Sequence, residues 1–225
     1  LGTGEAVPNE VIPVRRVPSY FIAPDWVRLW RPASLDPVKD LSLLVGADAP
    51  VNARGLELST LDEVTVGYRL FVRQSESPSL LRRVFRARTT AEGFKSWLLP
   101  RVLDRGYAEA EHELRLRQLH RDLIEDLRLE AVVGIHAFGM SLEEAEQRFR
   151  EVGYLSRETA AYEAEVAAVD PGAGSAALGR LLLEELARDY LRSHPLVSAA
   201  ELEEAFLSES LVPLRLVRFK LLGMR

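Results

Sequence analysis

The chain contains no cysteine among its 225 residues. This absence excludes disulfide bonds, thiol catalysis and cysteine-ligated zinc, and it fits a reducing compartment. The chain also lacks any apolar run near the ~18 residues that a membrane-spanning helix needs. Its first residues show neither the charged region nor the apolar region of a signal peptide. We therefore expect a cytoplasmic protein with no membrane partner.

Charges of both signs are interspersed along the chain, and the formal net charge is -5 at pH 7. The sequence lacks the basic footprint of a nucleic-acid-binding protein, so we expect no nucleic-acid partner. Hydrophobic residues make up 47% and charged residues 28% of the chain. This is the balance of a soluble globular protein that can bury a core, and the length allows one large or two small domains.

Prolines are concentrated at the N-terminus, where residues 1–55 hold seven of the twelve. Because proline fixes φ and removes a backbone donor, we expect this segment to be an irregular arm packed on the rest of the chain. Residues 20–23 and 41–45 have the composition of short extended segments within it. Trp26 and Trp30 are expected to anchor the arm through apolar packing.

Helical spacing, capping residues and prolines divide residues 56–225 into a series of helices. Two capping boxes, which begin at Ser141 and Ser198, mark helix starts directly. The first helix carries the adjacent carboxylates Asp62 and Glu63 and is interrupted near Gly67. The expected helices cover residues 56–74, a segment from 78, 90–99 with a kink or stop at 100, 108–138, segments from 141 and 156, 176–193, a segment from 198, and 213–222. The sequence therefore predicts a mostly α fold in which residues 56–225 form one domain.

The helix expected over residues 108–138 has an apolar stripe with a period close to 3.6 residues. The stripe consists of Leu116, Leu119, Leu123, Leu127, Ala131 and Ile135. This pattern is typical of an amphipathic helix that packs through one face.

The histidines do not form a recognisable catalytic set. His112 and Glu113 begin like a zinc-peptidase helix, but Leu116 stands where the second histidine is needed. The next histidine, His120, lies about 12 Å along the helix, too far for both to bind one ion. His136 lies among apolar residues near a helix end, where structural hydrogen bonding, the commoner role, and catalysis are both open.

Five segments match a known family when they are taken in order. Residues 60–68 read Thr-Leu-Asp-Glu-Val-Thr-Val-Gly-Tyr, residues 92–97 read Glu-Gly-Phe-Lys-Ser-Trp, and further landmarks lie at residues 128–141, 171–179 and 213–214. These segments resemble the C-terminal half of bacterial proteins in the domain of unknown function 885 family, which look like zinc-dependent carboxypeptidases. The resemblance implies a multi-helix, gluzincin-type domain over residues 56–225, with an irregular N-terminal arm and a few short strands.

The departures from the family fall on its metal site. Asp62 and Tyr68 stand where the family has zinc-binding histidines, whereas Glu63 resembles its general base and Glu92 its third metal ligand. His136 also matches a family position. A catalytic zinc needs about three protein ligands, and a neutral tyrosine, with a pKa of about 10, is a poor one. Asp62 and Glu92 together would suit a harder cation than zinc.

The resemblance therefore implies a metallopeptidase-like pseudoenzyme that acts as a binding or structural subunit and carries no cofactor. The alternative is a residual metal-dependent peptidase or hydrolase that uses Asp62, Glu63, Glu92 and His136 with zinc or another divalent cation. A small ligand in the former active-site cleft is a third alternative. Because family members look about twice as long, an exposed cleft wall implies a protein partner: a separate N-terminal half, an active paralogue or a second copy of the chain.

Overall fold

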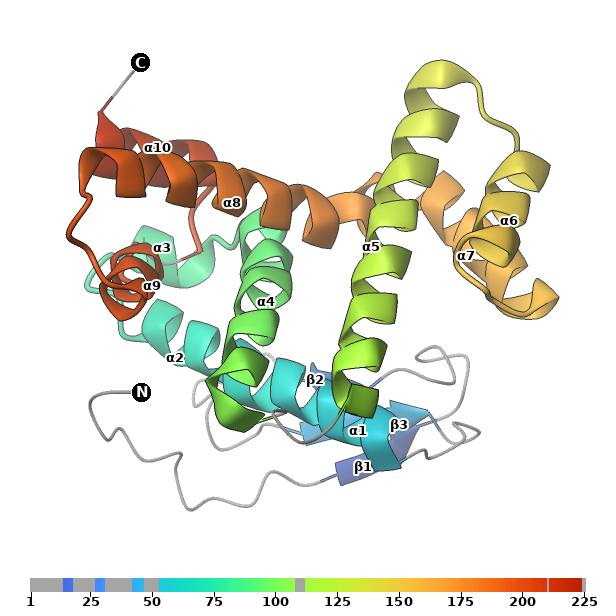
Figure 1. The fold of residues 1–225 in the computed structure, drawn as a ribbon, viewed down its shortest axis with the longest axis horizontal. Coiled ribbons are helices and arrows are strands. Elements are labelled where there is room, and N and C mark those ends of the chain that lie inside the picture. The colour runs from blue at the N-terminus through green and yellow to red at the C-terminus, as the bar shows by residue number, and fades with distance from the viewer. Residues whose placement is uncertain are drawn as a thin grey trace. The chain divides into compact units, whose positions relative to one another are not determined.

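Helices account for most of the backbone, as the sequence predicts (Figure 1). The computed structural model describes residues 14–17, 27–30, 42–46, 53–107, 112–209 and 211–223. The chain divides into two compact units, residues 1–69 and residues 70–225. Helical structure begins at Ala53, close to the change of pattern expected at residue 55.

The first unit contains a three-stranded sheet with the order β1-β3-β2. Its strands are β1 (Val14–Val17), β2 (Val27–Trp30) and β3 (Ser42–Gly46). The central strand β3 pairs in parallel with β1 and antiparallel with β2. Its position agrees with the extended segment expected at 41–45. The segment at 20–23, Trp26 and the side chain of Trp30 lie outside the described residues.

A helical run follows the sheet and contains the stretch with the paired carboxylates. It consists of α1 (Ala53–Thr60), the wider π-type turn η1 (Leu61–Tyr68) and α2 (Arg69–Ser75). The interruption expected near Gly67 corresponds to η1, where the backbone widens instead of breaking. Wide turns of this kind insert an extra residue into a helix and therefore shift the face on which later side chains lie.

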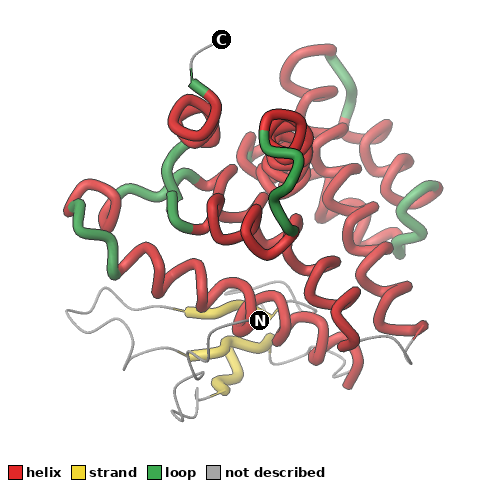
Figure 2. The backbone as a smooth tube through the Cα atoms, turned by 60° about the vertical axis from the view of Figure 1, so that its left-hand side comes forward, coloured by secondary structure: helices red, strands yellow, loops and turns green. Residues whose placement is uncertain are grey.

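The second unit is built entirely of helices and turns in its described part (Figure 2). Serine side chains at positions 79, 141, 156 and 198 accept hydrogen bonds from backbone N–H groups and start four of the helices, so both predicted capping boxes are confirmed. Pro100 does not end its helix, which continues to Val102. The elements are α3 (Leu80–Val84), α4 (Arg88–Val102), η2 (Leu103–Tyr107), α5 (His112–Phe138), α6 (Leu142–Glu151), α7 (Arg157–Val169), η3 (Pro171–Gly174), α8 (Ser175–Ser193), α9 (Ala199–Leu207) and α10 (Leu214–Leu222).

Helices α4 and α8 cross at two glycines and approach each other to backbone contact. A Cβ atom on Gly179 would lie 2.0 Å from the carbonyl oxygen of Thr89 and 2.6 Å from the Cα of Gly93. A Cβ atom on Gly93 would lie 2.4 Å from the Cα of Gly179. Such distances are far inside van der Waals contact, so the crossing accepts glycine at both positions and no larger residue.

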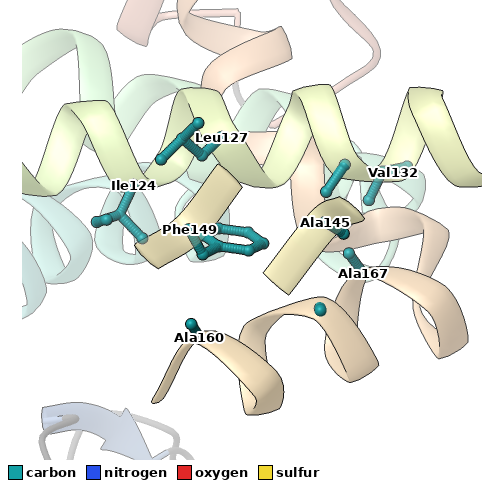
Figure 3. Close-up of a cluster of buried hydrophobic side chains, with 9 residues drawn as sticks. Ile124, Leu127, Val132, Ala145, Phe149, Ala160 and Ala167 are labelled. Carbon is teal, nitrogen blue, oxygen red and sulfur yellow. The ribbon is translucent and has the colours of Figure 1, made fainter. Parts of the chain in front are cut away.

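A separate hydrophobic core joins α5 to the α6–α7 hairpin (Figure 3). Phe149 of α6 lies among Leu127 of α5 and small residues such as Ala145 and Ala160, whose size leaves room for the ring. The backbone of Gly153 also packs against Leu127, since a Cβ there would lie 3.0 Å from a methyl carbon of that leucine. Burial of these apolar surfaces, at about 25 cal/mol per Å², holds the hairpin on α5.

The expected apolar stripe of α5 is buried over part of its length. Leu127 and Ala131 are buried, whereas Leu116 and Leu119 are exposed. The hairpin covers the C-terminal half of this 27-residue helix, and its edge is marked by the His120 side chain, whose Nε2 lies 2.8 Å from the carbonyl oxygen of Gly153. Nearer its N-terminus, α5 buries the opposite side, at 100° per residue, through residues that include Leu114 and Gln118.

Candidate functional site

The paired carboxylates lie in η1 of the first unit. Asp62 is buried and Glu63 is half-buried. The side chain of Tyr68 lies outside the described part of the chain. The structure therefore places two of the predicted site residues on one turn of a widened helix.

Glu92 and His136 belong to the second unit and contact different neighbours. The Glu92 carboxylate lies 3.0 Å from Nζ of Lys95 and 3.6 Å from the Arg86 guanidinium. The Nε2 atom of His136 lies 3.1 Å from the carbonyl oxygen of Ala167 in α7. This contact joins the end of α5 to α7.

Potential metal ligands do not gather in the part of the chain that the structure describes. Within those residues, no three histidine, aspartate or glutamate side chains lie close enough together to hold an ion. The expectation that the chain carries no cofactor stays a prediction, since it concerns the whole protein.

A group of polar side chains on α5 is linked to α4 by one hydrogen bond. The Ser96 hydroxyl donates to the Glu125 carboxylate at 2.7 Å, and the Arg121 side chain donates to the same carboxylate at 3.2 Å. One turn away, the Gln118 amide donates to the carboxylate of Asp122. Burial raises the pKa of Asp122 to about 6, and the nearby negative charge of Glu125 adds to the effect.

The α5–α7 contact contains a buried ion pair. The Arg128 guanidinium donates two hydrogen bonds to the Glu163 carboxylate, at 2.6 and 2.5 Å. Burial by itself would lower the pKa of Arg128, but the bonds and charge of Glu163 outweigh burial and raise it. A paired and fully bonded ion of this kind is expected to fix the geometry of a helix pair.

An open depression of about 530 Å³ lies where α5 meets α6. Phe138 and Met140 form its apolar side, and Arg148 lies on its polar side. The Arg148 guanidinium is already bonded to Glu130 at 2.8 and 3.1 Å. Glu144 and Glu151 also line the depression, and their carboxylates accept hydrogen bonds from the Ser141 N–H and the Gln147 amide.

Groups of large apolar side chains lie uncovered on several helices of the second unit, among them α3, α8 and α10. On α3 and its C-terminal cap these are Leu80, Leu81, Val84 and Phe85, which are 65–68% exposed. On α8 they are Leu178, Leu181 and Leu182, which are 39–47% exposed, and on α10 they are Leu216 and Phe219. Contiguous groups of this kind mark interaction surfaces more often than isolated exposed residues do.

Comparison with known proteins shows the fold. No family model matches the chain, and no curated protein matches it. Two solved structures are similar: a "putative lipoprotein" from Colwellia psychrerythraea, with 22% identity and a TM-score of 0.80, and a "putative lipoprotein of unknown function" from Shewanella oneidensis, with 20% identity and a TM-score of 0.76. The match covers 95% and 96% of this chain. The chain spans 38% and 41% of the length of these two chains.

These findings overturn two of the sequence-based expectations. Membership of the domain of unknown function 885 family is contradicted, since no family model matches and the similar structures are described as lipoproteins and not as zinc carboxypeptidases. The cytoplasmic location is contradicted as well, since lipoproteins are anchored to membranes outside the cytoplasm. The family assignment was based on short motif matches separated by long gaps. Such matches are too short to identify the family of a helical protein. No described helix is long and apolar enough to cross a bilayer.

Sequence reasoning missed the uncovered apolar surfaces. The residues of α3 were recognised as a helix by their spacing, but periodicity gives no information on what covers a helix face. One signal was available in the sequence. Residues 79–88 combine four large apolar residues with four arginines and contain no acidic residue, which is unusual in an acidic chain.

Proposed function

We propose that this chain is a binding module that docks a helix of another polypeptide along α8 and works outside the cytoplasm. The observation that carries the proposal is the leucine group of α8, Leu178, Leu181 and Leu182. These residues lie at the i, i+3 and i+4 positions of one helix side and are partly exposed.

The same side of α8 has a partner further along the helix. Arg218 of α10 forms ion pairs with Glu185 and Asp189, so α10 covers the C-terminal part of this side. Helix α10 has 9 residues and α8 has 19. The leucine group therefore continues a helix-packing surface beyond the place where its described partner lies.

An apolar helix from outside the 225 residues fits this continuation. The similar solved chains are more than twice as long as this one, and the chain spans about two fifths of each. Additional polypeptide is a constituent of those proteins, and we propose that a helix from polypeptide outside these 225 residues fills this place. A helix that buries three leucines gains several kcal/mol, at about 25 cal/mol per Å² of apolar surface.

Photo-crosslinking tests the proposal. A photo-reactive phenylalanine at position 181 is expected to cross-link the intact chain to one defined polypeptide in its native host, with the cross-linked peptide identified by mass spectrometry. The same label at Tyr154, which is 81% exposed and lies in the α6–α7 hairpin, is the control. A Leu178→Glu change should abolish the cross-link at 181, because a charge at the packed surface opposes burial.

Two results would contradict the proposal. One is a position-181 label that reacts no more than the position-154 label. The other is a strictly monomeric wild type in which Leu178→Glu changes nothing. If the captured polypeptide is a second copy of this chain, sedimentation equilibrium will show a dimer, which identifies the partner as self. The residual hydrolase based on Asp62, Glu63, Glu92 and His136 has no observation in its favour.

A further inference from the structure

We infer that α3 and α10 form a membrane-facing surface that binds anionic phospholipid head groups and inserts apolar side chains between them. The inference rests on the proposed setting outside the cytoplasm. It does not depend on the polypeptide partner of α8, since different side chains are involved.

Helix α3 presents its apolar residues outward in a fixed geometry. It has no buried residue, yet Ser79 caps its start and the buried amide of Gln74 donates to the carbonyl oxygens of Arg82, Arg83 and Phe85 at 3.3–3.4 Å. The backbone is thus held from beneath while the apolar side chains stay in water. Such an arrangement has an energetic cost unless another phase covers it.

Side chains of α3 and α10 reach the same carboxylate. Glu209 is buried, and its carboxylate lies 3.6 Å from Arg82 of α3 and 2.7 Å from Lys220 of α10. Figure 1 shows α3, α9 and α10 at the same end of the second unit. On α10, Leu216 and Phe219 are exposed beside Arg215 and Lys220.

The two segments that form this surface are basic in sequence, although five of their seven basic side chains form ion pairs with acids of other elements. Residues 79–88 contain four arginines and no acid, and residues 213–223 contain three basic residues and no acid, in a chain of net charge -5. Within the described residues, Arg83 and Arg215 are exposed and form no ion pair. Two free guanidinium groups next to exposed leucine and phenylalanine side chains match a bilayer surface, where anionic head groups lie over acyl chains.

Alternation of aromatic, aliphatic and arginine side chains is also found at protein interfaces, but two features favour the lipid surface. The apolar side chains belong to two helices and are 50–68% exposed. The similar solved structures are described as lipoproteins, which work next to a bilayer. A phospholipid surface adapts to an exposed basic face, whereas a protein partner needs matching shape.

Vesicle flotation of the intact chain tests this inference. Vesicles of phosphatidylglycerol and phosphatidylethanolamine are expected to carry the chain upward at low ionic strength, and pure phosphatidylcholine vesicles are not. Added salt should weaken the binding, because it screens exposed charges. Arg83→Glu combined with Arg215→Glu should weaken it at least about tenfold, since each basic residue near an anionic surface contributes a several-fold factor.

Two further variants separate the apolar contribution from general effects. Leu81→Ser combined with Phe85→Ser removes exposed side chains from α3 and should weaken flotation without changing the helical circular dichroism spectrum. Tyr154→Ser combined with Arg157→Glu is the matched control, since these residues are 81% and 84% exposed in the α6–α7 hairpin. This control should float like the wild type.

The inference is overturned if the wild type does not float with phosphatidylglycerol vesicles, or if the control loses as much binding as the α3 variants. It is also overturned if vesicles do not carry the wild type upward and the α3 substitutions reduce the amount of another protein that binds to the chain. The surface would then dock a protein. Failure here leaves the cross-link at Leu181 unaffected. The two proposals can therefore fail separately.

Discussion

Asp122 is an ionisable group of α5 that accepts a hydrogen bond from Gln118 and lies close to Glu125. Arg121 and Arg180 lower its pKa, but burial and the charges of Glu125 and Asp126 raise it more, to about 6 from an ordinary value of 3.8. The folded chain therefore binds a proton at Asp122 more tightly than the unfolded chain does. The stability that this proton gives is fully present below pH 3.8 and is lost as the pH rises through 6.

We predict that Asp122→Asn stabilises the chain at pH 7.5 and has little effect at pH 4. Asparagine resembles the protonated carboxyl group, and its amide can donate to the buried Oε1 of Gln118, which lacks a donor within the described residues. After discounting for partial exposure, we expect a gain of about 1–2 kcal/mol in the free energy of unfolding at pH 7.5. Urea unfolding at the two pH values measures it.

The exposed carboxylate of Asp104 provides the control for this effect. Its side chain is 63% exposed and lies 3.3 Å from Arg115 at the surface. Asp104→Asn should change stability by less than about 1 kcal/mol at both pH values. The prediction is wrong if the two substitutions have equal effects at pH 7.5, or if Asp122→Asn loses stability. Either result would show that ionisation of Asp122 does not lower the free energy of unfolding.

At the scale of helices, residues close together in the sequence determine where a helix begins, whereas packing against distant residues determines which of its faces is buried. The capping boxes at Ser141 and Ser198 could be predicted because the capping bonds span three residues of sequence. The covering of each helix face could not, since it depends on distant residues. The stripe of α5 shows this, because Leu127 lies under α6 while Leu116, on the same side, lies beyond the hairpin.

The α4–α8 crossing gives a prediction at this scale. Gly179→Ala places a Cβ atom 2.0 Å from the backbone oxygen of Thr89, and backbone atoms cannot turn away as a flexible side chain can. The two helices must separate, so we expect a loss of about 3 kcal/mol in the free energy of unfolding. A fall of several degrees in the melting temperature, followed by circular dichroism, measures this loss.

Gly139→Ala is the matched control for the crossing. Gly139 has φ of +74° and nothing lies within 4 Å of a Cβ built there, so its substitution tests backbone strain without steric contact. The expected loss is about 1 kcal/mol. If Gly179→Ala costs no more than Gly139→Ala, the close approach of α4 and α8 does not contribute to stability as described.

At the scale of the whole molecule, the fold of this chain corresponds to one part of two longer solved chains. It spans about two fifths of the similar solved chains, and at 20–22% identity the likeness shows common architecture alone. The helical class could be predicted from spacing. The family could not be predicted in this way. A few motif residues in separate helices indicate a function only when their side chains meet, and Glu92 and His136 contact different elements.

The metal content of the intact protein is the last property that separates a binding module from a hydrolase. We predict that the purified chain contains far less than one equivalent of zinc, manganese or calcium by elemental analysis. Asp62 and Glu92 are carboxylates, and a tyrosine is a poor metal ligand in its neutral form, whose ordinary pKa is about 10. A set of this kind lacks the nitrogen ligands that make zinc sites tight.

Thermal unfolding with added metal gives the same test a second readout. A site filled at a hundredfold excess over its Kd would add about 2.7 kcal/mol to the free energy of unfolding. We expect no such gain with zinc or manganese and no loss with a chelator. The hydrolase would be favoured if the wild type contained stoichiometric metal and gained stability from it, and if Asp62→Ala lost that metal. Glu113→Ala, at an exposed surface position, is the control and should leave the metal content unchanged.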